Sequence, residues 1–232
     1  NFRYSIWEDK LTEKLNSFKP HLVGISCMFT MSHQSVKLIA SAIKKYDTNL
    51  PIIGGGVHLS NARKLVLEDC EDIDFIGVYE CDKSFPDLID FINGKLPKEN
   101  LTQLATTING EFVSFEDRAT PSSHEIEASP VFHNLPIDNY NEVGQIGSYG
   151  FLRRGRKAAS ILSNRGCRAH CTFCSVASFN GPGVRARSVR SVTDEIRFKR
   201  EMYDIRHLTW LDDDLLNDRK RALELFNGIT KL

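Results

Sequence analysis

The sequence lacks the features that would place the protein in a membrane or outside the cell. No apolar stretch among the 232 residues approaches the length of a membrane span, and no secretory signal peptide opens the chain. Thirty Lys and Arg residues balance thirty Asp and Glu residues, so the overall charge indicates no polyanionic partner such as nucleic acid. Only six cysteines are present. Their scarcity and the missing export signal predict a cytoplasmic protein in a reducing environment, without a membrane partner.

Two common phosphate-binding signatures are missing as well. The triplet Gly54-Gly55-Gly56 is no Gly-x-Gly-x-x-Gly dinucleotide fingerprint, and no Walker-type Gly-Lys-Ser follows it. The chain also begins without Met and stops at Leu232, inside a predicted helix that begins at Asp218. We therefore expect the sequence to be an internal piece of a longer protein.

Three of the six cysteines are concentrated in one short stretch, residues 163–174, which we call the cysteine segment. Cys167, Cys171 and Cys174 follow the spacing Cys-x-x-x-Cys-x-x-Cys. This spacing allows one loop to bind three irons of an iron–sulfur cube while the fourth iron has no protein ligand. An open metal position is typical of a catalytic site rather than a structural one. The segment therefore predicts a 4Fe-4S cluster that binds a further group.

A zinc site is the alternative for these three cysteines. Structural zinc requires four nitrogen or sulfur ligands in a tetrahedron, and His170 is the nearest fourth candidate. It is adjacent to Cys171, and neighbouring side chains seldom reach one metal together, which favours the cluster. The remaining cysteines have no ligand spacing and are predicted to be buried or incidental thiols: Cys27, Cys70 and Cys81.

The first half of the chain alternates short apolar runs with amphipathic stretches, which predicts a parallel sheet with helices on both faces. The predicted strands are residues 21–26, 51–53 and 73–78, and the predicted helices are residues 7–18, 32–46, 61–67 and 85–92. Ligands bind to such sheets at the carboxyl ends of the strands. A glycine triplet at such an end lets the backbone approach a bulky ligand closely, although it is equally typical of a tight turn.

The second half begins another alternation of strand and helix. Residues 158–163 and 207–211 are predicted strands, and a predicted helix runs between them from about Val192 to Tyr203. The first of these strands carries the cysteine segment at its carboxyl end, which is where barrel enzymes place their catalytic groups.

The cysteine spacing, with Phe173 directly before the last cysteine, resembles the signature of the radical S-adenosylmethionine enzymes. The resemblance implies that S-adenosylmethionine chelates the open iron, with Phe173 beside it, and that its reductive cleavage gives a 5′-deoxyadenosyl radical. It also implies that Asp212 and Asp213 bind the amino group of this cofactor. Alternatively, these acids cap the following helix. Arg187 either binds a cofactor carboxylate or pairs with Glu195.

Three segments of the first half, residues 20–26, 55–58 and 74–80, resemble the cobalamin-binding domain that precedes the radical domain in one subfamily. The resemblance implies that the nucleotide tail of cobalamin is buried beside the carboxyl edge of the sheet. For His58 the alternative is a polar residue that opens a helix after a turn. The cobalamin contacts that the resemblance implies are Ser26, Met28, Gly54, Gly55, Gly56, His58, Val78 and Glu80.

The sequence departs from the family pattern in two ways. The usual Gly-Glu-Gly-Glu segment is here Gly77-Val78-Tyr79-Glu80, and no Asp-x-His-x-x-Gly motif supplies a histidine ligand to cobalt. The first strand of the subfamily is expected to lie before Asn1.

The expected fold class is therefore α/β: a Rossmann-like cobalamin-binding domain with a parallel sheet, followed by the first part of a radical S-adenosylmethionine (β/α) partial TIM barrel. We expect the first domain at residues 1–100 and the truncated barrel at residues 156–232. Residues 101–155 between them are predicted to form a connector, with a hairpin at Gln103–Phe115 around the turn Asn109-Gly110.

The resemblance implies a cobalamin-dependent radical S-adenosylmethionine enzyme, with methyl transfer to an unactivated centre as the expected reaction. The expected cofactors are a 4Fe-4S cluster, S-adenosylmethionine and cobalamin. The expected partners are a small-molecule or peptide substrate and an external electron donor such as flavodoxin or ferredoxin. Three alternatives remain: a radical cyclase or rearrangement enzyme with a vestigial or non-methylating cobalamin domain, a tRNA methylthiotransferase, and a zinc-stabilised binding module without enzymatic activity.

Overall fold

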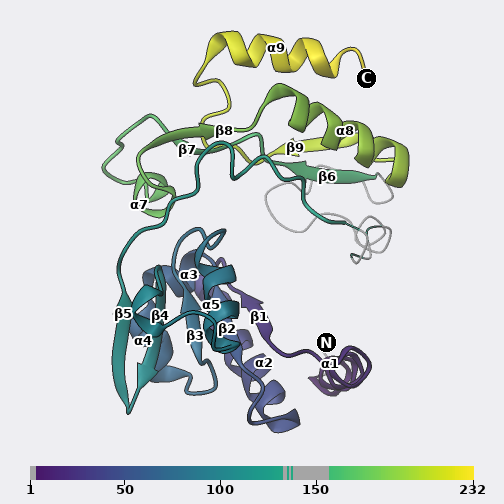
Figure 1. The fold of residues 1–232 in the computed structure, drawn as a ribbon. Coiled ribbons are helices and arrows are strands. Elements are labelled where there is room, and N and C mark those ends of the chain that lie inside the picture. Colours follow the sequence, from purple (N-terminus) through teal and green to yellow (C-terminus); the bar gives the residue numbers. More distant parts are fainter. Residues whose placement is uncertain (1–3, 133–134, 136, 138–156) are drawn as a thin grey trace. The chain divides into compact units, whose positions relative to one another are not determined.

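The computed structural model describes residues 4–132, 135, 137 and 157–232 (Figure 1). The chain divides into two compact units, Asn1–Thr120 and Pro121–Leu232. Within the described ranges, no helix is both long enough and apolar enough to cross a bilayer.

The first unit is built around a five-stranded sheet with the order β1-β2-β3-β4-β5. The strands β1 (Val23–Ser26), β2 (Ile52–Gly55) and β3 (Phe75–Gly77) are parallel. In this register Ser26 is the partner of Gly55, so the carboxyl ends of β1 and β2 are level with each other. The expected parallel sheet is therefore confirmed.

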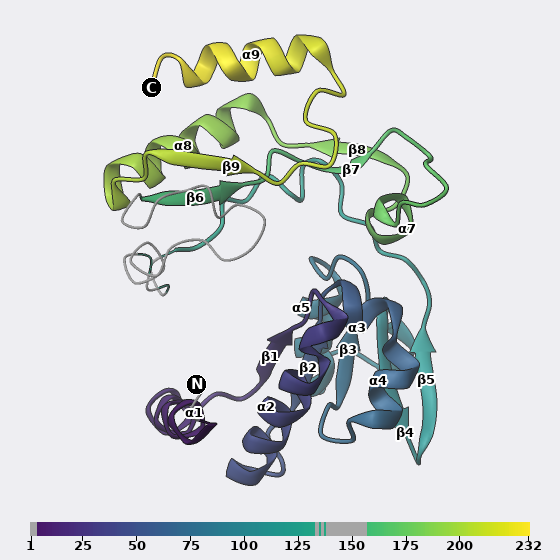
Figure 2. The ribbon, with the colours of Figure 1, turned by 180° about the vertical axis from the view of Figure 1, so that it is seen from behind.

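Helices cover both faces of this sheet. The helices of the unit are α1 (Tyr4–Phe18), α2 (His33–Tyr46), α3 (Val57–Asn61), α4 (Arg63–Asp69) and α5 (Ser84–Ile92), with 3-10 turns at η1 (Thr30–Ser32) and η2 (Lys98–Asn100). Helices α2 and α4 lie on one face of the sheet (Figure 2), where their apolar side chains pack with Ile52 and Ile76. Helix α5 lies on the opposite face (Figure 1), where its Leu88 packs with Ile53 and Leu104.

The hairpin expected in the connector belongs to this sheet. Its strands, β4 (Leu104–Ile108) and β5 (Glu111–Phe115), are antiparallel, and β4 pairs with β3. Leu104 and Ala105 of β4 are fully buried on opposite faces of the sheet. The hairpin is therefore part of the first unit, which continues to Thr120.

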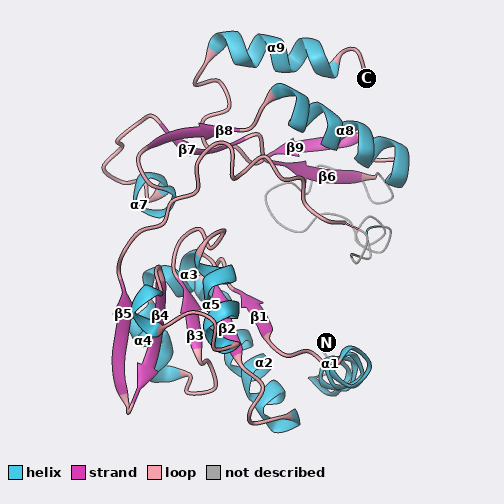
Figure 3. Ribbon diagram, viewed as in Figure 1, coloured by secondary structure: helices cyan, strands magenta, loops and turns pink. Residues whose placement is uncertain are grey.

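The second unit contains a parallel pair of strands, β6 (Ala158–Ile161) and β9 (His207–Trp210) (Figure 3). The helices α8 (Val189–Tyr203) and α9 (Arg219–Ile229) pack on this pair through a buried apolar cluster of Ile161, Val192, Ile196 and Leu225. Helix α8 begins before the predicted start, because the Ser188 hydroxyl caps it by accepting a hydrogen bond from the Ser191 N–H.

The sequence did not predict a second hairpin, whose two strands enclose the loop that carries Cys171 and Cys174. Its strands are β7 (Asn164–Cys167) and β8 (Gly183–Ala186), and a short helix, α7 (Val176–Asn180), lies between them in the sequence. The predicted strand 158–163 ends at Ile161, so Cys167 is the last residue of β7 and the other two cysteines follow β7 rather than β6 directly.

Candidate functional site

A cavity of about 330 Å³ lies at the carboxyl ends of β1, β2 and β3. Side chains alternate between the two faces of a strand, and the face toward α5 carries Gly24 and Ser26 on β1 and Gly55 on β2. These small residues leave the space that larger side chains would fill. The cavity is lined by Gly24, Ile25, Ser26, Ile53, Gly54, Gly55, Gly56, Gly77, Tyr79, Cys81 and Phe85.

The glycines of this cavity have different roles. A Cβ atom added to Gly24 or Gly55 would meet no atom within 4 Å, so a side chain at either position would project into open space. Gly56 has φ +96, and a Cβ there would lie 2.6 Å from the carbonyl oxygen of Cys27. Gly56 is therefore needed for the close approach of β1 and β2, whereas Gly24 and Gly55 form a cradle that side chains would fill.

The structure brings half of the predicted cobalamin residues to this cavity. Ser26, Gly54, Gly55 and Gly56 line it. Among the other four predicted residues, Met28 is exposed, Val78 is buried with its backbone hydrogen-bonded to Gln103, and Glu80 is buried; none of these lines the cavity. Sequence reasoning missed several lining residues, notably Gly24, Tyr79, Cys81 and Phe85, although the pair Gly24-x-Ser26 on one strand face was visible in the sequence.

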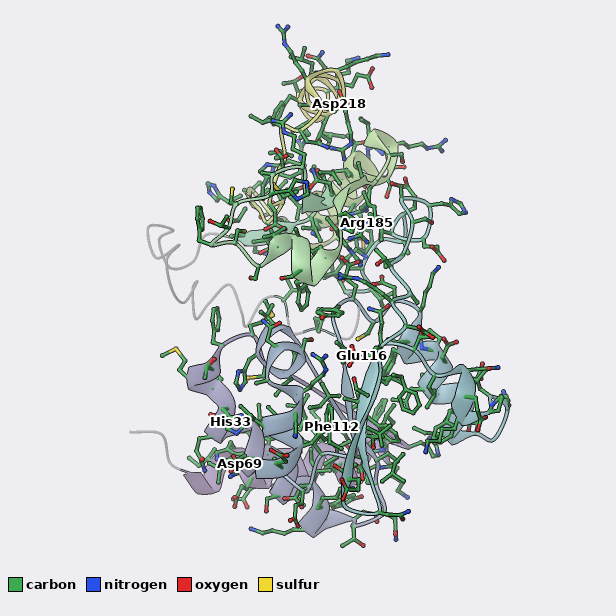
Figure 4. The ribbon with its side chains drawn as sticks, turned by 90° about the vertical axis from the view of Figure 1, so that its left-hand side faces the viewer. His33, Asp69, Phe112, Glu116, Arg185 and Asp218 are labelled. Atoms are coloured by element: carbon green, nitrogen blue, oxygen red, sulfur yellow. The ribbon has the colours of Figure 1, made fainter. Side chains whose placement is uncertain are left out.

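The fourth of these residues, His58, belongs to a polar network instead. Its Nδ1 lies 3.1 Å from Thr30 Oγ1, and its Nε2 lies 3.0 Å from His33 Nδ1. His33 Nε2 in turn lies 2.8 Å from Asp69 Oδ2, which also accepts a hydrogen bond from Lys37 (Figure 4). Burial and the neighbouring His33 lower the pKa of His58. Both ring nitrogens therefore have protein partners.

Tyr79 stands where the subfamily pattern has its second glycine, and its backbone adopts the conformation that glycine favours. Its φ is +65, which is rare for a residue with a bulky side chain. The Tyr79 N–H donates to Ser60 Oγ over 3.0 Å, and the Arg118 guanidinium lies 4.5 Å from the ring centroid. These contacts hold the strained residue in the cavity wall.

The three clustered cysteines lie in and after β7. Cys167 is the last residue of the strand, whereas Cys171 and Cys174 are exposed. The Cys174 N–H donates to the Cys171 carbonyl over 3.1 Å, and the Ala169 N–H donates to Cys167 Sγ over 3.4 Å. Backbone N–H groups directed at sulfur are among the contacts that tune iron–sulfur clusters. Phe173, beside Cys174, is 91% exposed.

The cysteine segment offers a cluster three thiols from one loop. Among the residues that the structure describes, no three His, Cys, Asp or Glu side chains converge as the ligands of one ion would. Three thiolates that bind three different irons of a cube do not need to converge on one point. Three thiols on one loop, two of them exposed, are therefore compatible with a cluster.

Arg187 adopts the second of its two expected arrangements. Its Nη1 lies 2.6 Å from Glu195 Oε2, and both side chains are buried. Lys199 is buried beside them, with its Nζ 2.5 Å from Glu195 Oε1, and burial lowers the pKa of Lys199. The single negative charge of Glu195 therefore faces the positive charges of both Arg187 and Lys199.

Asp212 and Asp213 follow β9 and lie against the cysteine segment. Asp212 accepts hydrogen bonds from Ser163 and Asn164, and Asp213 accepts one from Asn180. Partial burial and the neighbouring Asp212 raise the pKa of Asp213. Neither caps α9, because its N-cap is Asp218.

Comparisons with known proteins agree with these features. Residues 3–89 match the family model of the B12 binding domain. The chain is 25% identical to cytidylyl-2-hydroxyethylphosphonate methyltransferase from Streptomyces wedmorensis, over 99% of this chain and 46% of that protein. It is 23% identical to anaerobic magnesium-protoporphyrin IX monomethyl ester cyclase from Rubrivivax gelatinosus, over 97% of this chain and 39% of that protein.

Solved structures share the fold. The radical S-adenosylmethionine methyltransferase TsrM from Kitasatospora setae superimposes with a TM-score of 0.78 at 18% identity, over 99% of this chain and 44% of that one. The cobalamin-dependent S-adenosylmethionine radical enzyme OxsB gives a TM-score of 0.68 at 19% identity, over 97% of this chain and 31% of that one. The chain thus spans less than half the length of the proteins it matches. The expected α/β fold class is confirmed, and so is the resemblance of the first half of the chain to a cobalamin-binding domain.

Proposed function

We propose that this chain, which has a B12-binding domain at residues 3–89 and the fold of the cobalamin-dependent radical S-adenosylmethionine enzymes, is part of such an enzyme. The reaction we propose is methyl transfer to an unactivated centre of a small molecule or peptide. The enzyme would act in the cytoplasm and receive its electrons from a flavodoxin or ferredoxin.

The observation that carries the proposal is the combination of two sites. The cysteine segment offers three thiols from one loop, and the sheet of the B12-binding domain ends in a glycine-lined cavity. When bound, the 4Fe-4S cluster, S-adenosylmethionine and cobalamin would supply the radical and the methyl group. The protein supplies ligands, orientation and shelter from water.

The residues of each site have a specific role in this proposal. Cys167, Cys171 and Cys174 would bind three irons as thiolates. The cradle at Gly24 and Gly55 would receive the flat, apolar end of the cobalamin tail, because neither residue has a side chain in its way.

A radical cyclase is the second candidate, because one of the relatives is named a cyclase. The methylthiotransferase alternative is weaker, since it needs three further cluster cysteines. Cys27 and Cys70 are buried in the apolar core of the first unit, where burial raises the pKa of each thiol, and buried thiols of this kind are poor ligands for a cluster.

The test is to purify the intact protein without oxygen and to measure its corrinoid, iron and sulfide content. The purified protein is then supplied with a reductant and with S-adenosylmethionine that carries a labelled methyl group. Label in the bound corrinoid supports the methyltransferase. Formation of 5′-deoxyadenosine with label only in methionine and in unreacted S-adenosylmethionine would favour the cyclase, and bound zinc without iron or sulfide would contradict both.

A further inference from the structure

The three acids that follow β9 contact residues before, within and after the run of cysteines. At the start of the segment, Asp212 Oδ1 accepts hydrogen bonds from the Ser163 hydroxyl over 2.7 Å, the Ser163 N–H over 3.0 Å and the Asn164 N–H over 2.6 Å. Asp212 Oδ2 lies 3.1 Å from the same Ser163 N–H. A carboxylate has about four acceptor sites, so protein donors already use most of the capacity of Asp212.

The next two acids extend this contact along the segment. Asp214 accepts a hydrogen bond from Asn164 Nδ2 with its backbone carbonyl, over 3.1 Å. Its carboxylate pairs with Arg168 Nε, which lies between the first two cysteines, over 3.2 Å. Asp213 Oδ2 accepts from Asn180 Nδ2 over 3.2 Å, at the end of α7. The acids therefore contact residues before, within and after the run of cysteines.

Ser163, at the start of the segment, is held by hydrogen bonds at every polar group. It is fully buried, and its carbonyl oxygen accepts from the Arg187 N–H over 2.9 Å and from Arg221 Nη2 over 2.8 Å. With the bonds to Asp212, every polar group of Ser163 has a partner. Charge-assisted hydrogen bonds to backbone groups are roughly twice as strong as neutral ones.

We propose that Asp212, Asp213 and Asp214 act as a clamp that holds the cysteine segment in its cluster-binding conformation, with Asp212 as the main positioning residue. The inference rests on the proposed function, because it assigns the clamp to a segment that binds a cluster. It differs from the role that the resemblance implied for Asp212, namely binding of the cofactor amino group. The two roles predict different consequences when the donors to Asp212 are removed.

The test compares Asp212→Asn and Ser163→Ala with Asp194→Asn, an exposed acid on α8 that pairs with Arg197, in the intact protein. The first readout is amide hydrogen exchange of residues 163–167 in the iron-free protein. The second is the rate at which a chelator removes iron from the reconstituted protein. The third is the affinity for S-adenosylmethionine per bound cluster.

The clamp predicts that Asp212→Asn increases both the amide exchange rate and the rate of iron loss by about tenfold or more. The substitution removes the negative charge and places an N–H donor where the carboxylate accepts hydrogen bonds from backbone N–H groups. It predicts an increase of about fivefold for Ser163→Ala, which removes one hydroxyl donor to Asp212 and leaves the Asp212 carboxylate in place. Affinity for S-adenosylmethionine per cluster should stay within about twofold of the unmodified protein.

Two results would overturn the clamp: unchanged exchange and iron loss in both variants, or a large loss of S-adenosylmethionine affinity in Asp212→Asn with unchanged iron retention. Failure of the unmodified protein to bind any cluster would defeat the proposed function instead. The exchange experiment on the iron-free protein would still decide whether the clamp exists.

Discussion

Replacing Gly166 by Ala should open the hairpin that carries Cys167. Gly166 has φ +87, and its added Cβ would lie 2.4 Å from the carbonyl oxygen of Gly183. The left-handed conformation costs Ala about 1–2 kcal/mol, and displacing the facing backbone adds about 1–3 kcal/mol. We therefore expect the free energy of opening β7 to fall by about 2–5 kcal/mol. Hydrogen exchange of the β7 amides measures this loss, and the iron content after anaerobic reconstitution measures its consequence.

Gly183→Ala is the matched control for this substitution. Gly183 belongs to the same hairpin and has φ +77, but its added Cβ would meet no atom within 4 Å. Only the conformational cost of about 1–2 kcal/mol applies to Gly183→Ala. Most of the protection of the β7 amides from hydrogen exchange and most of the iron content should therefore remain. Equal losses in the two variants would refute the reasoning, because they would show that the contact between Gly166 and Gly183 has no energetic importance.

Three further predictions concern the buried charges, the histidine network and the cavity. Glu195→Gln should lower the free energy of unfolding in urea by about 3–5 kcal/mol, because it leaves buried Arg187 and Lys199 without a counterion; a loss no larger than that of Asp194→Asn would contradict this. Because folding lowers the pKa of His58, the unfolded state binds more protons than the folded state as the pH falls below about 7. The free energy of unfolding should therefore decrease as the pH falls through 6.5, and this pH dependence should weaken in His58→Asn. Asp69, whose pKa is lowered by Lys37 and His33, adds to the loss only near and below its ordinary value of 3.8; an identical urea midpoint at pH 7.5 and 5.5 would contradict the histidine prediction. Gly55→Leu should fill the cavity and weaken corrinoid binding, measured by absorbance titration, by about tenfold or more, and unchanged binding would place the corrinoid elsewhere.

Much of the first unit could be predicted because its signals are local. The apolar runs of β1, β2 and β3 and the spacing of apolar residues in α2 identify these elements without any long-range information. The turn Asn109-Gly110 also identifies its hairpin, since φ values of +52 and +81 at these two residues suit a type I′ turn. The sheet that the hairpin joins could not be predicted, because the pairing of β4 with β3 depends on contacts between distant residues.

The hairpin β7–β8 had no comparable signal. The sequence Asn164-Arg165-Gly166-Cys167 shows no alternation of apolar and polar residues, and its pairing depends on a close contact between two glycines that are far apart in the chain. A strand of this kind is specified by its partner rather than by its own side chains.

The candidate sites likewise contain some residues with a local sequence signal and others whose partners are distant in the sequence. Cysteine spacing is a local pattern, so the three candidate cluster ligands could be proposed from the sequence alone, and their role as ligands stays a prediction. The partners of Asp212 and His58 are contributed by segments remote in sequence, Ser163 and Asn164 in one case and Thr30 and His33 in the other. Identifying them required knowledge of which strand ends and loops meet in the folded chain.

The central claim is that Cys167, Cys171 and Cys174 bind a cluster with one open iron. The most direct test is electron paramagnetic resonance of the intact protein, reconstituted and reduced without oxygen, before and after addition of S-adenosylmethionine. We predict about four irons per chain, a 4Fe-4S signal that S-adenosylmethionine changes, and loss of that signal in Cys171→Ala. An unmodified protein that binds no iron, or a signal that S-adenosylmethionine leaves unchanged, would contradict the account.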